Sequence, residues 1–226
     1  MIFFTSDLHL DHQNVIKHSN RPFASVQQMN EEIIKRWNKK VGVNDVIYVL
    51  GDVCWGWNSD KIQQTFSKMN GIKYLIIGNH DKFSPHQKSN VWAEIVPYKR
   101  ITIDDKRIIL SHYPIAEWDC AWHQSIHLYG HTHGKFNLAE FTKLMPHKNT
   151  NCMDVGVDTH NFEPWSWEEI KEYLYQRNMK TNCDICGKEI IGIENFIDAG
   201  DKVVCSENCL QKAIEKFTHW QNTESK

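Results

Sequence analysis

Polar side chains that can bind metal ions follow five apolar runs along this chain. In chain order they are Asp7 and His9, then Asp52, then Asn79 with His80 and Asp81, then His112, and finally His131 and His133. The mixture of carboxylate, imidazole and amide oxygen suits a divalent ion such as Mn²⁺, Fe²⁺ or Zn²⁺. Leaving out His80 and Asp81, seven candidate ligands remain. That is too many for one tetrahedral site and indicates two ions, which can clamp the attacking and leaving oxygens of an in-line displacement at phosphorus.

The strongest single signal is the stretch from Tyr74 to Asp81. Four apolar residues run into Gly78, which predicts a buried strand ending at a tight turn. Gly78 lets the backbone come close to whatever lies there. A lone Asn-His-Asp tripeptide is also compatible with a solvated loop, so the interpretation depends on the whole series of strand ends.

The same alternation of strand and loop is repeated along the chain. Apolar runs predict strands at residues 2–5, 45–50, 74–77, 100–103, 107–110, 126–129 and 153–158. Capping residues and apolar stripes predict helices between Ser25 and Gly42, from Ser59 to Met69, and from Ser166 to about Arg177. This pattern predicts an α/β fold whose ligand site lies in the loops at the strand ends.

The polar blocks occur in a specific order: Asp-x-His, Gly-Asp, Gly-Asn-His-Asp, a lone His, then Gly-His-x-His. This order resembles the calcineurin-like metallophosphoesterase superfamily over roughly residues 1–177. The segments Asn-Arg-Pro-Phe at 20–23 and Asp-Val-Gly-Val-Asp at 154–158 are similar to a branch of small bacterial and phage phosphohydrolases. The resemblance implies a two-sheet αββα sandwich, which we assign to a domain of residues 1–178.

The resemblance also implies two sets of metal ligands. One ion would be held by Asp7, His9, Asp52 and His133, and the other by Asp52, Asn79, His112 and His131. Asp52 and a water or hydroxide would bridge the two ions, and the hydroxide would attack phosphorus. Mn²⁺ is the expected ion, with Fe, Ni or Zn as alternatives.

Four further residues are expected to take part in catalysis or in substrate binding. His80 is not needed as a ligand and is expected to protonate the leaving oxygen. Asp81 is expected to orient His80. Arg21 could form a bidentate pair with a phosphate oxygen, and His12 could lie at the mouth of the site. For Arg21 and His12 a solvated loop position is an equally open interpretation.

The reaction implied is hydrolysis of a phosphoester, and several substrates are compatible with it. The residues around Gly51-Asp52 and before Gly78 lack the arginines of protein phosphatases in the superfamily, which argues against a phosphoprotein. A phosphodiester is favoured because Arg21 is the one cationic clamp in evidence. The alternatives are a nuclease for DNA or RNA, a phosphomonoesterase, and a non-catalytic scaffold.

A second module is expected in residues 179–226. It contains two cysteine pairs, Cys183 with Cys186 and Cys205 with Cys209, ahead of an amphipathic stretch. Four thiolates suit one structural Zn²⁺, which a segment of this size needs for stability. The arrangement resembles a treble-clef or zinc-ribbon finger that could bind nucleic acid or a protein partner. Four unrelated reduced thiols are the alternative interpretation.

Composition places further bounds on the protein. The formal net charge of −2 gives no bulk attraction to nucleic acid or anionic membranes. No apolar run approaches the roughly 20 residues that span a bilayer, so a cytoplasmic location is expected, where structural disulfides are rare. Six tryptophans are expected to pack in the core or at its rim, with a platform for the substrate as the less favoured alternative: Trp55, Trp57, Trp118, Trp122, Trp165 and Trp167.

Overall fold

The computed structural model of the protein describes residues 1–141, 143–145, 147, 149–178, 181–182, 185–187, 189–190, 197–198, 203–204, 206 and 208–212. The chain divides into two compact units, Met1–Ile170 and Lys171–Lys226. The division lies within helix α6 (Trp167–Asn178), eight residues before the domain boundary expected after residue 178, which stays a prediction.

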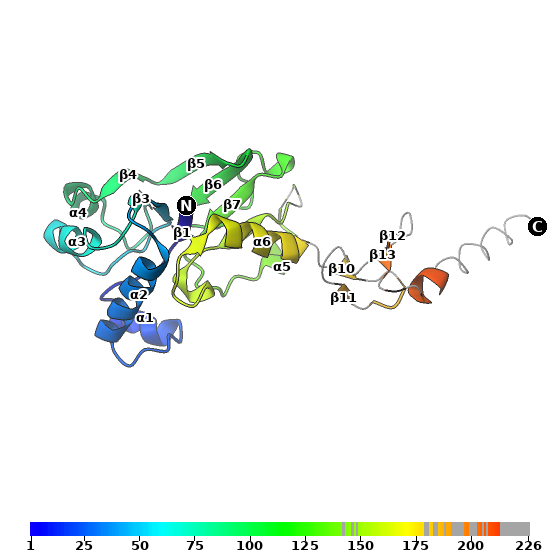
Figure 1. Ribbon diagram of the computed structural model, residues 1–226, viewed down its shortest axis with the longest axis horizontal. Coiled ribbons are helices and arrows are strands. Elements are labelled where there is room, and N and C mark those ends of the chain that lie inside the picture. Colours follow the sequence, from blue (N-terminus) through cyan, green and yellow to red (C-terminus); the bar gives the residue numbers. More distant parts are fainter. Residues whose placement is uncertain are drawn as a thin grey trace, which may run out of the picture. The chain divides into compact units, whose positions relative to one another are not determined.

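The first unit contains a five-stranded sheet with the order β4-β3-β2-β1-β9 (Figure 1). Its strands are β1 (Ile2–Thr5), β2 (Val46–Val49), β3 (Ile72–Ile76), β4 (Trp92–Val96) and β9 (Trp165–Ser166). Strands β1 to β4 are parallel, and β9 is antiparallel to β1. The carboxyl ends of β1, β2 and β3 therefore lie along one edge of the sheet.

A second, four-stranded sheet has the order β5-β6-β7-β8. Its strands are β5 (Tyr98–Ile103), β6 (Lys106–Ser111), β7 (Ile126–Tyr129) and β8 (Cys152–Asp154). A hairpin pairs β5 with β6, while β6, β7 and β8 are parallel. The carboxyl ends of β6, β7 and β8 again share one edge.

Helices pack on the first sheet through apolar stripes. The helices of the first unit, beside α6, are α1 (Gln13–His18), α2 (Val26–Lys40), α3 (Ser59–Phe66), α4 (Phe83–Lys88) and α5 (Leu138–Phe141), with 3-10 turns η1 (Ala121–His123) and η2 (Val157–Thr159). In α2, Met29, Ile33 and Trp37 are spaced at helical intervals and form one core with Phe3 of β1 and Leu75 of β3. Burial of this stripe fixes the sheet edge that carries the polar loops.

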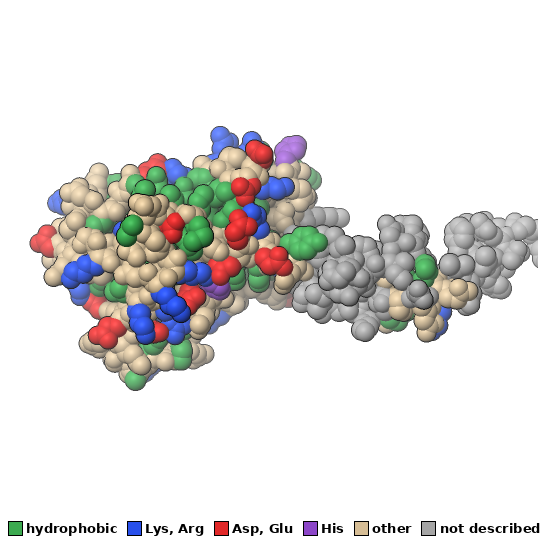
Figure 2. All heavy atoms as spheres, viewed as in Figure 1, with side chains coloured by type: hydrophobic (Ala, Val, Ile, Leu, Met, Phe, Trp, Pro, Cys, Tyr) green, Lys and Arg blue, Asp and Glu red, His purple; other side chains and the backbone are tan. Residues whose placement is uncertain are grey.

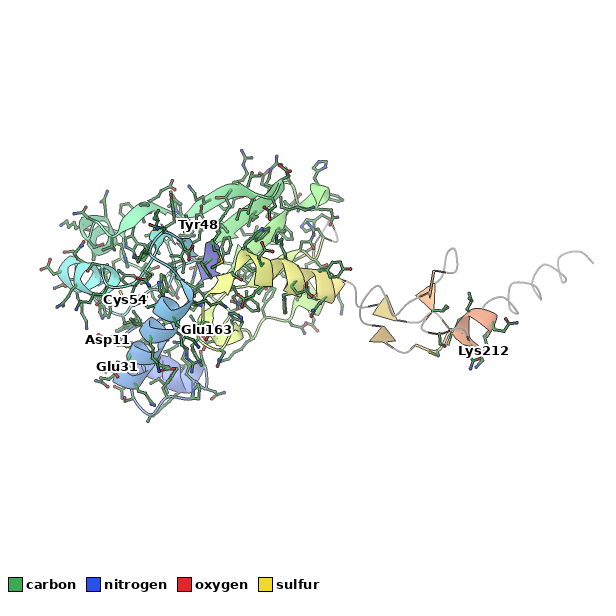
Figure 3. All side chains as sticks on the ribbon, viewed as in Figure 1. Asp11, Glu31, Tyr48, Cys54, Glu163 and Lys212 are labelled. Atoms are coloured by element: carbon green, nitrogen blue, oxygen red, sulfur yellow. The ribbon has the colours of Figure 1, made fainter. Side chains whose placement is uncertain are left out.

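The two sheets are joined at their polar ends. Ser6, after β1, forms a parallel bridge with Gly156, and Val157 N–H donates to Ser6 O at 3.0 Å. The loop after β1 also pairs with the loop after β2 through a bridge between Leu10 and Cys54. Cys54 and Asp11, which follows Leu10, are labelled in Figure 3. The mixed α/β architecture with two sheets confirms the expected fold class.

The second unit contains short paired strands. β10 (Thr181–Asn182) pairs antiparallel with β11 (Glu189–Ile190), and β12 (Ile197–Asp198) pairs antiparallel with β13 (Val203–Val204). Residues 208–212 are helical. Of the four cysteines expected to bind zinc, Cys183 and Cys205 lie outside the described residues, while Cys186 is exposed and Cys209 is buried. The zinc site and the partners expected for it stay predictions.

The surface mixes both signs of charge. On the face drawn in Figure 2, basic and acidic side chains of the first unit lie interspersed, in keeping with the small net charge. Among the described residues, no helix combines the length and the apolar character that crossing a lipid bilayer requires.

Candidate metal centre and active site

The strand-end residues of both sheets converge into two adjacent clusters. One cluster contains Asp7, His9 and His133; the other contains Asp52, His112 and His131. In each cluster one ligand atom per residue lies within 4.8 Å of the others, so each group could hold a metal ion. Both clusters combine residues from the first sheet with residues from the second.

In the first cluster, the side chains present their ligand atoms to a common point. Asp7 Oδ1 lies 3.8 Å from His9 Nε2 and 3.9 Å from His133 Nε2. His133 directs Nε2 inward because its Nδ1 is hydrogen-bonded to Asp158 at 2.7 Å. The second oxygen of Asp7 accepts a hydrogen bond from His131 N–H at 2.8 Å, which leaves Oδ1 for the cluster.

In the second cluster, His112 is fixed in the same way. Its Nδ1 is 2.7 Å from Leu50 O, so that atom carries the proton and Nε2 is the ligand atom. Nε2 lies 2.9 Å from Asn79 Oδ1 and 3.5 Å from Asp52 Oδ2. Asn79, expected as a ligand, is thus in contact with the same imidazole.

Asp52 is the residue that both clusters approach. Its Oδ2 lies 3.6 Å from His9 Nε2 in the first cluster and 3.5 Å from His112 Nε2 in the second. Its Oδ1 accepts a hydrogen bond from His80 N–H at 2.9 Å. The carboxylate is therefore held by one oxygen and offers the other between the two groups of ligands.

Divalent ions fit these residues on two grounds. Asp7 Oδ1 and His9 Nε2 are buried, and neither has a hydrogen-bond partner within the described part of the chain. Burying such atoms unpaired is costly, and a cation would satisfy both. Ligands of one ion lie within about 4.2 Å of each other, twice a bond of roughly 2.1 Å, and the distances of 3.8 and 3.9 Å between the ligand atoms of the first cluster meet this limit.

The clusters perturb the protonation of their members. Burial raises the pKa of Asp7 to about 7, against the pull of His112 and His133. Burial lowers the pKa of His9 to about 3 despite the Asp52 carboxylate. At His112 burial acts in the same downward direction, but Asp52 and Asp7 outweigh it and raise the pKa to about 8. Burial would raise the pKa of Asp52, yet its hydrogen bond and charge pairing with His112 lower it to about 2.

The backbone of the site is unusual. Five of the seven expected ligands have positive φ angles between 50° and 70°: Asp7, His9, Asp52, His131 and His133. A left-handed conformation in a non-glycine residue costs of the order of 1–3 kcal/mol, and such residues cluster at functional sites. The surrounding hydrogen bonds hold these side chains in directions that ordinary strand or helix backbone would not give.

Two glycines allow the strand ends to come together. A Cβ at Gly78 would overlap the Asp52 carboxylate, and a Cβ at Gly130 would overlap Ser6 next to Asp7. The close approach expected at Gly78 is confirmed. The equivalent role of Gly130 was missed, although its place before His131 resembles that of Gly78 before Asn79.

The structure corrects the role expected for Arg21. Its guanidinium is fully buried and donates two hydrogen bonds to Asp158, both at 2.8 Å. It also donates to Leu8 O at 2.9 Å and to Asp7 O at 2.6 Å. Because these groups occupy the guanidinium, Arg21 does not face a substrate phosphate; it holds Asp158, which in turn orients His133.

Asp81 also has a different role from the one expected. Its carboxylate accepts hydrogen bonds from the backbone N–H groups of Asp52, Val53 and Gly78 at 2.8 to 2.9 Å. It lies 3.5 Å from His86 Nε2. Asp81 therefore ties the ends of β2 and β3 together and positions Asp52 rather than the imidazole of His80.

His80 and His12 lie at the open side of the site. His80 is partly exposed, and its Nε2 is 3.9 Å from Asp52 Oδ2. His12 Nδ1 is 3.2 Å from His9 Nδ1, and the His12 ring stacks on Trp55. The roles expected for His80 as a proton donor and for His12 at the mouth agree with these positions and stay predictions.

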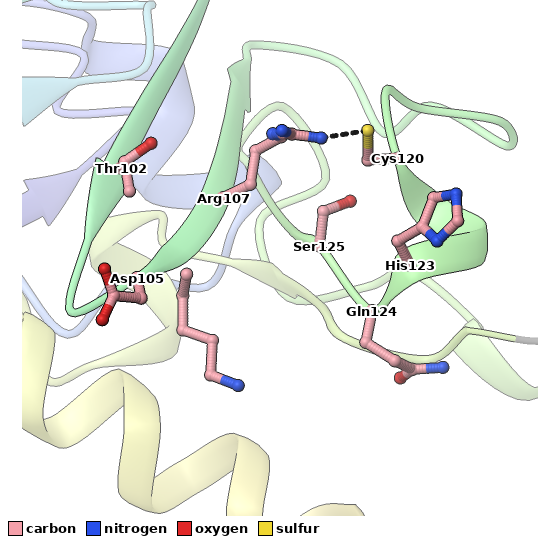
Figure 4. A pocket seen from close by; sticks show the side chains of 8 residues that line it. Thr102, Asp105, Arg107, Cys120, His123, Gln124 and Ser125 are labelled. Atoms are coloured by element: carbon pink, nitrogen blue, oxygen red, sulfur yellow. Dashed lines mark hydrogen bonds between the residues drawn. The ribbon is translucent and has the colours of Figure 1, made fainter.

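A cavity apart from the metal clusters, called the second cavity below, lies at the amino ends of β6 and β7. It has a volume of about 310 Å³. Its lining is polar: Thr102, Asp105, Lys106, Arg107, Cys120, His123, Gln124 and Ser125 (Figure 4). Figure 4 shows Arg107 turned toward the Cys120 thiol, with which it is in contact. This cavity faces away from His112 and His131, since those residues follow the carboxyl ends of the same strands.

A scan against known families matches residues 1–180 to the model described as calcineurin-like phosphoesterase. The chain belongs to this family. Calcineurin-like phosphoesterases depend on divalent metal ions, so the protein is a metal-dependent phosphoesterase, and each of the two clusters could hold a metal ion.

Three relatives of this calcineurin-like phosphoesterase are informative. An uncharacterised protein of Methanocaldococcus jannaschii, MJ1445, is 31% identical over 76% of this chain and 90% of its own length. The Gene 66 protein of Mycobacterium phage D29 is 27% identical over 76% of this chain and 95% of its own. The crystal structure of AQ665, a protein of unknown function from Aquifex aeolicus, is 27% identical with a TM-score of 0.60 and covers 76% of this chain and 98% of its own.

Proposed function

We propose that the protein hydrolyses phosphodiesters with two divalent ions, most simply Mn²⁺, held by the two clusters. The observation that carries this proposal is the position of Asp52, whose free oxygen lies 3.6 and 3.5 Å from one imidazole of each cluster. Two ions bound there would activate a water molecule and neutralise charge that develops on the phosphate.

The protein side chains supply the remaining functions. Asp158 and Leu50 O fix the tautomers of His133 and His112, so that Nε2 of each ring is the ligand atom. Asp81 holds the Asp52 backbone. His80 has its N–H bonded to Asp52 Oδ1 and its ring partly exposed, and its imidazolium would give a proton to the departing ester oxygen.

The pairing of Arg21 favours a diester over a monoester. A monoester dianion calls for a bidentate cation, and the guanidinium best placed in sequence to supply one is bound to Asp158. A diester monoanion needs less positive charge, which the ions themselves provide.

Hydrolysis of a simple dialkyl phosphodiester with added Mn²⁺ tests the proposal, with His80→Ala as the variant, because an alkoxide leaving group needs the proton that His80 would give. General acid catalysis is worth typically 10²–10⁴-fold, so kcat should fall by about that factor. The matched control is His123→Ala, which changes an imidazole in the second cavity. Equal rates for wild type and His80→Ala would reject the assigned role, and absence of diester hydrolysis in the wild type would reject the function.

A further inference from the structure

Two large aromatic side chains are exposed beside the site. Trp55 is 48% exposed and Tyr113 is 46% exposed. Most of the other tryptophans expected to pack are buried, namely Trp57, Trp118, Trp165 and Trp167. An exposed indole at the rim of a polar site is a ready surface for a flat ligand.

Trp55 is firmly placed next to His80. Its backbone N–H donates a hydrogen bond to Leu10 O at 2.8 Å, which fixes the loop after β2. The indole stacks on His12 with ring centroids 4.3 Å apart and planes 11° from parallel. It lies 5.2 Å from the His80 ring. The aromatic surface is therefore close to the group that would protonate the leaving oxygen.

Tyr113 is placed in a corresponding way beside the other cluster. It follows β6, and its ring centroid lies 5.0 Å from that of His112 and 4.7 Å from that of His131, edge to face in both cases. Each exposed aromatic residue thus adjoins a different group of ligands, Trp55 through His12 and Tyr113 directly.

A phosphodiester has two ester arms, and the two aromatic residues match them. We infer that the substrate is a nucleotide phosphodiester with unpaired bases, in which Trp55 stacks on the base of the leaving nucleotide and Tyr113 on the other base. This inference rests on the proposed diester hydrolysis. Trp55 takes the leaving side because it adjoins His80.

Two further features agree with an unpaired strand. A small cleft that adjoins His80 is also lined by Gly56 and Lys82, and the exposed ammonium of Lys82 suits the next phosphate of a chain. A base in a duplex is stacked between its neighbours and cannot present its face to an indole, whereas an unpaired base can. On the face drawn in Figure 2, the charges of the first unit are mixed and form no long basic track for a duplex.

The experiment compares four dinucleotides with Mn²⁺ present: both bases intact, the base missing on the leaving side, the base missing on the other side, and both missing. Stacking on an aromatic side chain is expected to make kcat/KM about 10- to 100-fold higher when the leaving-side base is present. In Trp55→Leu this ratio should fall to below about threefold, and Trp55→Phe should restore most of it. Tyr113→Leu should reduce the ratio for the other base. The matched control is Trp122→Leu, since Trp122 is 61% exposed and lies in η1; it should keep both ratios.

The outcomes separate this inference from the function on which it rests. If the wild type hydrolyses all four dinucleotides equally, the nucleotide inference is rejected and diester hydrolysis stands. If Trp55→Leu slows all four by the same factor, Trp55 acts through His12 and His80 and not on the base, which also rejects the inference. If no diester is hydrolysed, both proposals fail.

Discussion

The two ends of strands β6 and β7 contain similar residue types in very different states. At the carboxyl ends, His112 is buried and oriented by Leu50 O, and its Nε2 faces Asp52. At the amino ends, the Arg107 guanidinium contacts the Cys120 thiol in a cavity open to solvent. A histidine or a charged residue does not by itself make a metal site. Burial of His112 and the hydrogen bonds that orient the Nε2 atoms of His112 and His133 distinguish the first end from the second.

Removing the shared ligand should have the largest effect. Asp52→Asn keeps the shape of the side chain but removes the charge between the two clusters. We expect kcat/KM for a diester to fall by on the order of 10⁴-fold or more, because both ions lose a ligand. Bound metal per chain, measured after dialysis, should fall as well. Asp60→Asn, on the exposed side of α3, is the control; wild-type activity in Asp52→Asn would contradict the dinuclear proposal.

Loss of an orienting partner should cost less. Asp158→Asn weakens the hold on His133 Nδ1, and an outer partner of this kind is worth about 10- to 100-fold in metal affinity. It also leaves the Arg21 guanidinium buried without its counter-charge, so Tm should fall too. Metal titration and calorimetry would measure the two effects, again with Asp60→Asn as control. Unchanged affinity would show that Asp158 serves Arg21 alone.

The pH dependence of metal affinity should follow the raised pKa values. In the metal-free protein His112, with a pKa of about 8, and Asp7, with a pKa of about 7, carry protons at pH 6. Ions must displace those protons, so affinity should rise between pH 6 and 8, by up to about tenfold per pH unit for each proton displaced.

The titration of Asp7 and His112 also determines how the stability of the metal-free protein changes with pH. The metal-free Asp7 carboxyl is favoured as the neutral acid, so its contribution falls as pH rises from about 4 through 7. The His112 contribution is present below about 6.5 and is lost as pH rises through 8. Tm without metal, measured by calorimetry, should therefore decrease from pH 6 to 8.

The affinity for Mn²⁺, measured by isothermal titration calorimetry, should rise over the same pH range. An affinity that falls would contradict the assignment of Asp7 and His112 as metal ligands.

The smallest effect is expected at the amino ends of β6 and β7. Arg107→Gln removes a cation from the second cavity, far along the strand from His112. We expect kcat/KM to change by less than about twofold, within the range for surface substitutions. A tenfold loss in the same diester assay would show that the two ends of the sheet are coupled.

Much of the fold could be predicted because its signals are local. β1 and β7 have the expected bounds, and α2 is capped by Ser25 as the sequence indicates. α3 begins at Ser59 as expected, and the Asn58 side chain accepts the capping hydrogen bond from Lys61 N–H. The helix ends at Phe66, three residues before the expected end at Met69.

Among the elements that the sequence did not predict, β4 and α4 illustrate the physical reasons. β4 (Trp92–Val96) is a half-buried edge strand with no clear alternation, and it exists because β3 pairs with it. α4 is six residues long, contains Pro85 and exposes Phe83, so its sequence has no apolar stripe that would predict a helix.

At the site, the types and order of the ligands could be read from the sequence, but their supporting contacts could not. The pairing of Arg21 with Asp158 joins residues 137 positions apart, and no local pattern encodes such a contact. The same holds for Asp81, whose carboxylate faces the backbone of Asp52 and Val53 across two strand ends. The left-handed backbone at Asp7 and His9 is likewise accompanied by hydrogen bonds to a distant segment, from Asp7 N–H to Gly51 O and from His9 N–H to Asp52 O.

The division of each cluster between the two sheets has a consequence for the life of the protein in a cell. Asp7 and His9 follow a strand of one sheet and His133 follows a strand of the other, so any ion they share would cross-link the two sheets. Free metal at 100 times its dissociation constant would add about 2.7 kcal/mol to the free energy of unfolding. When metal is scarce, the protein would lose its activity and would also unfold more often. Proteases would then degrade more of it, so the cellular amount of the enzyme would depend on the concentration of the metal ion.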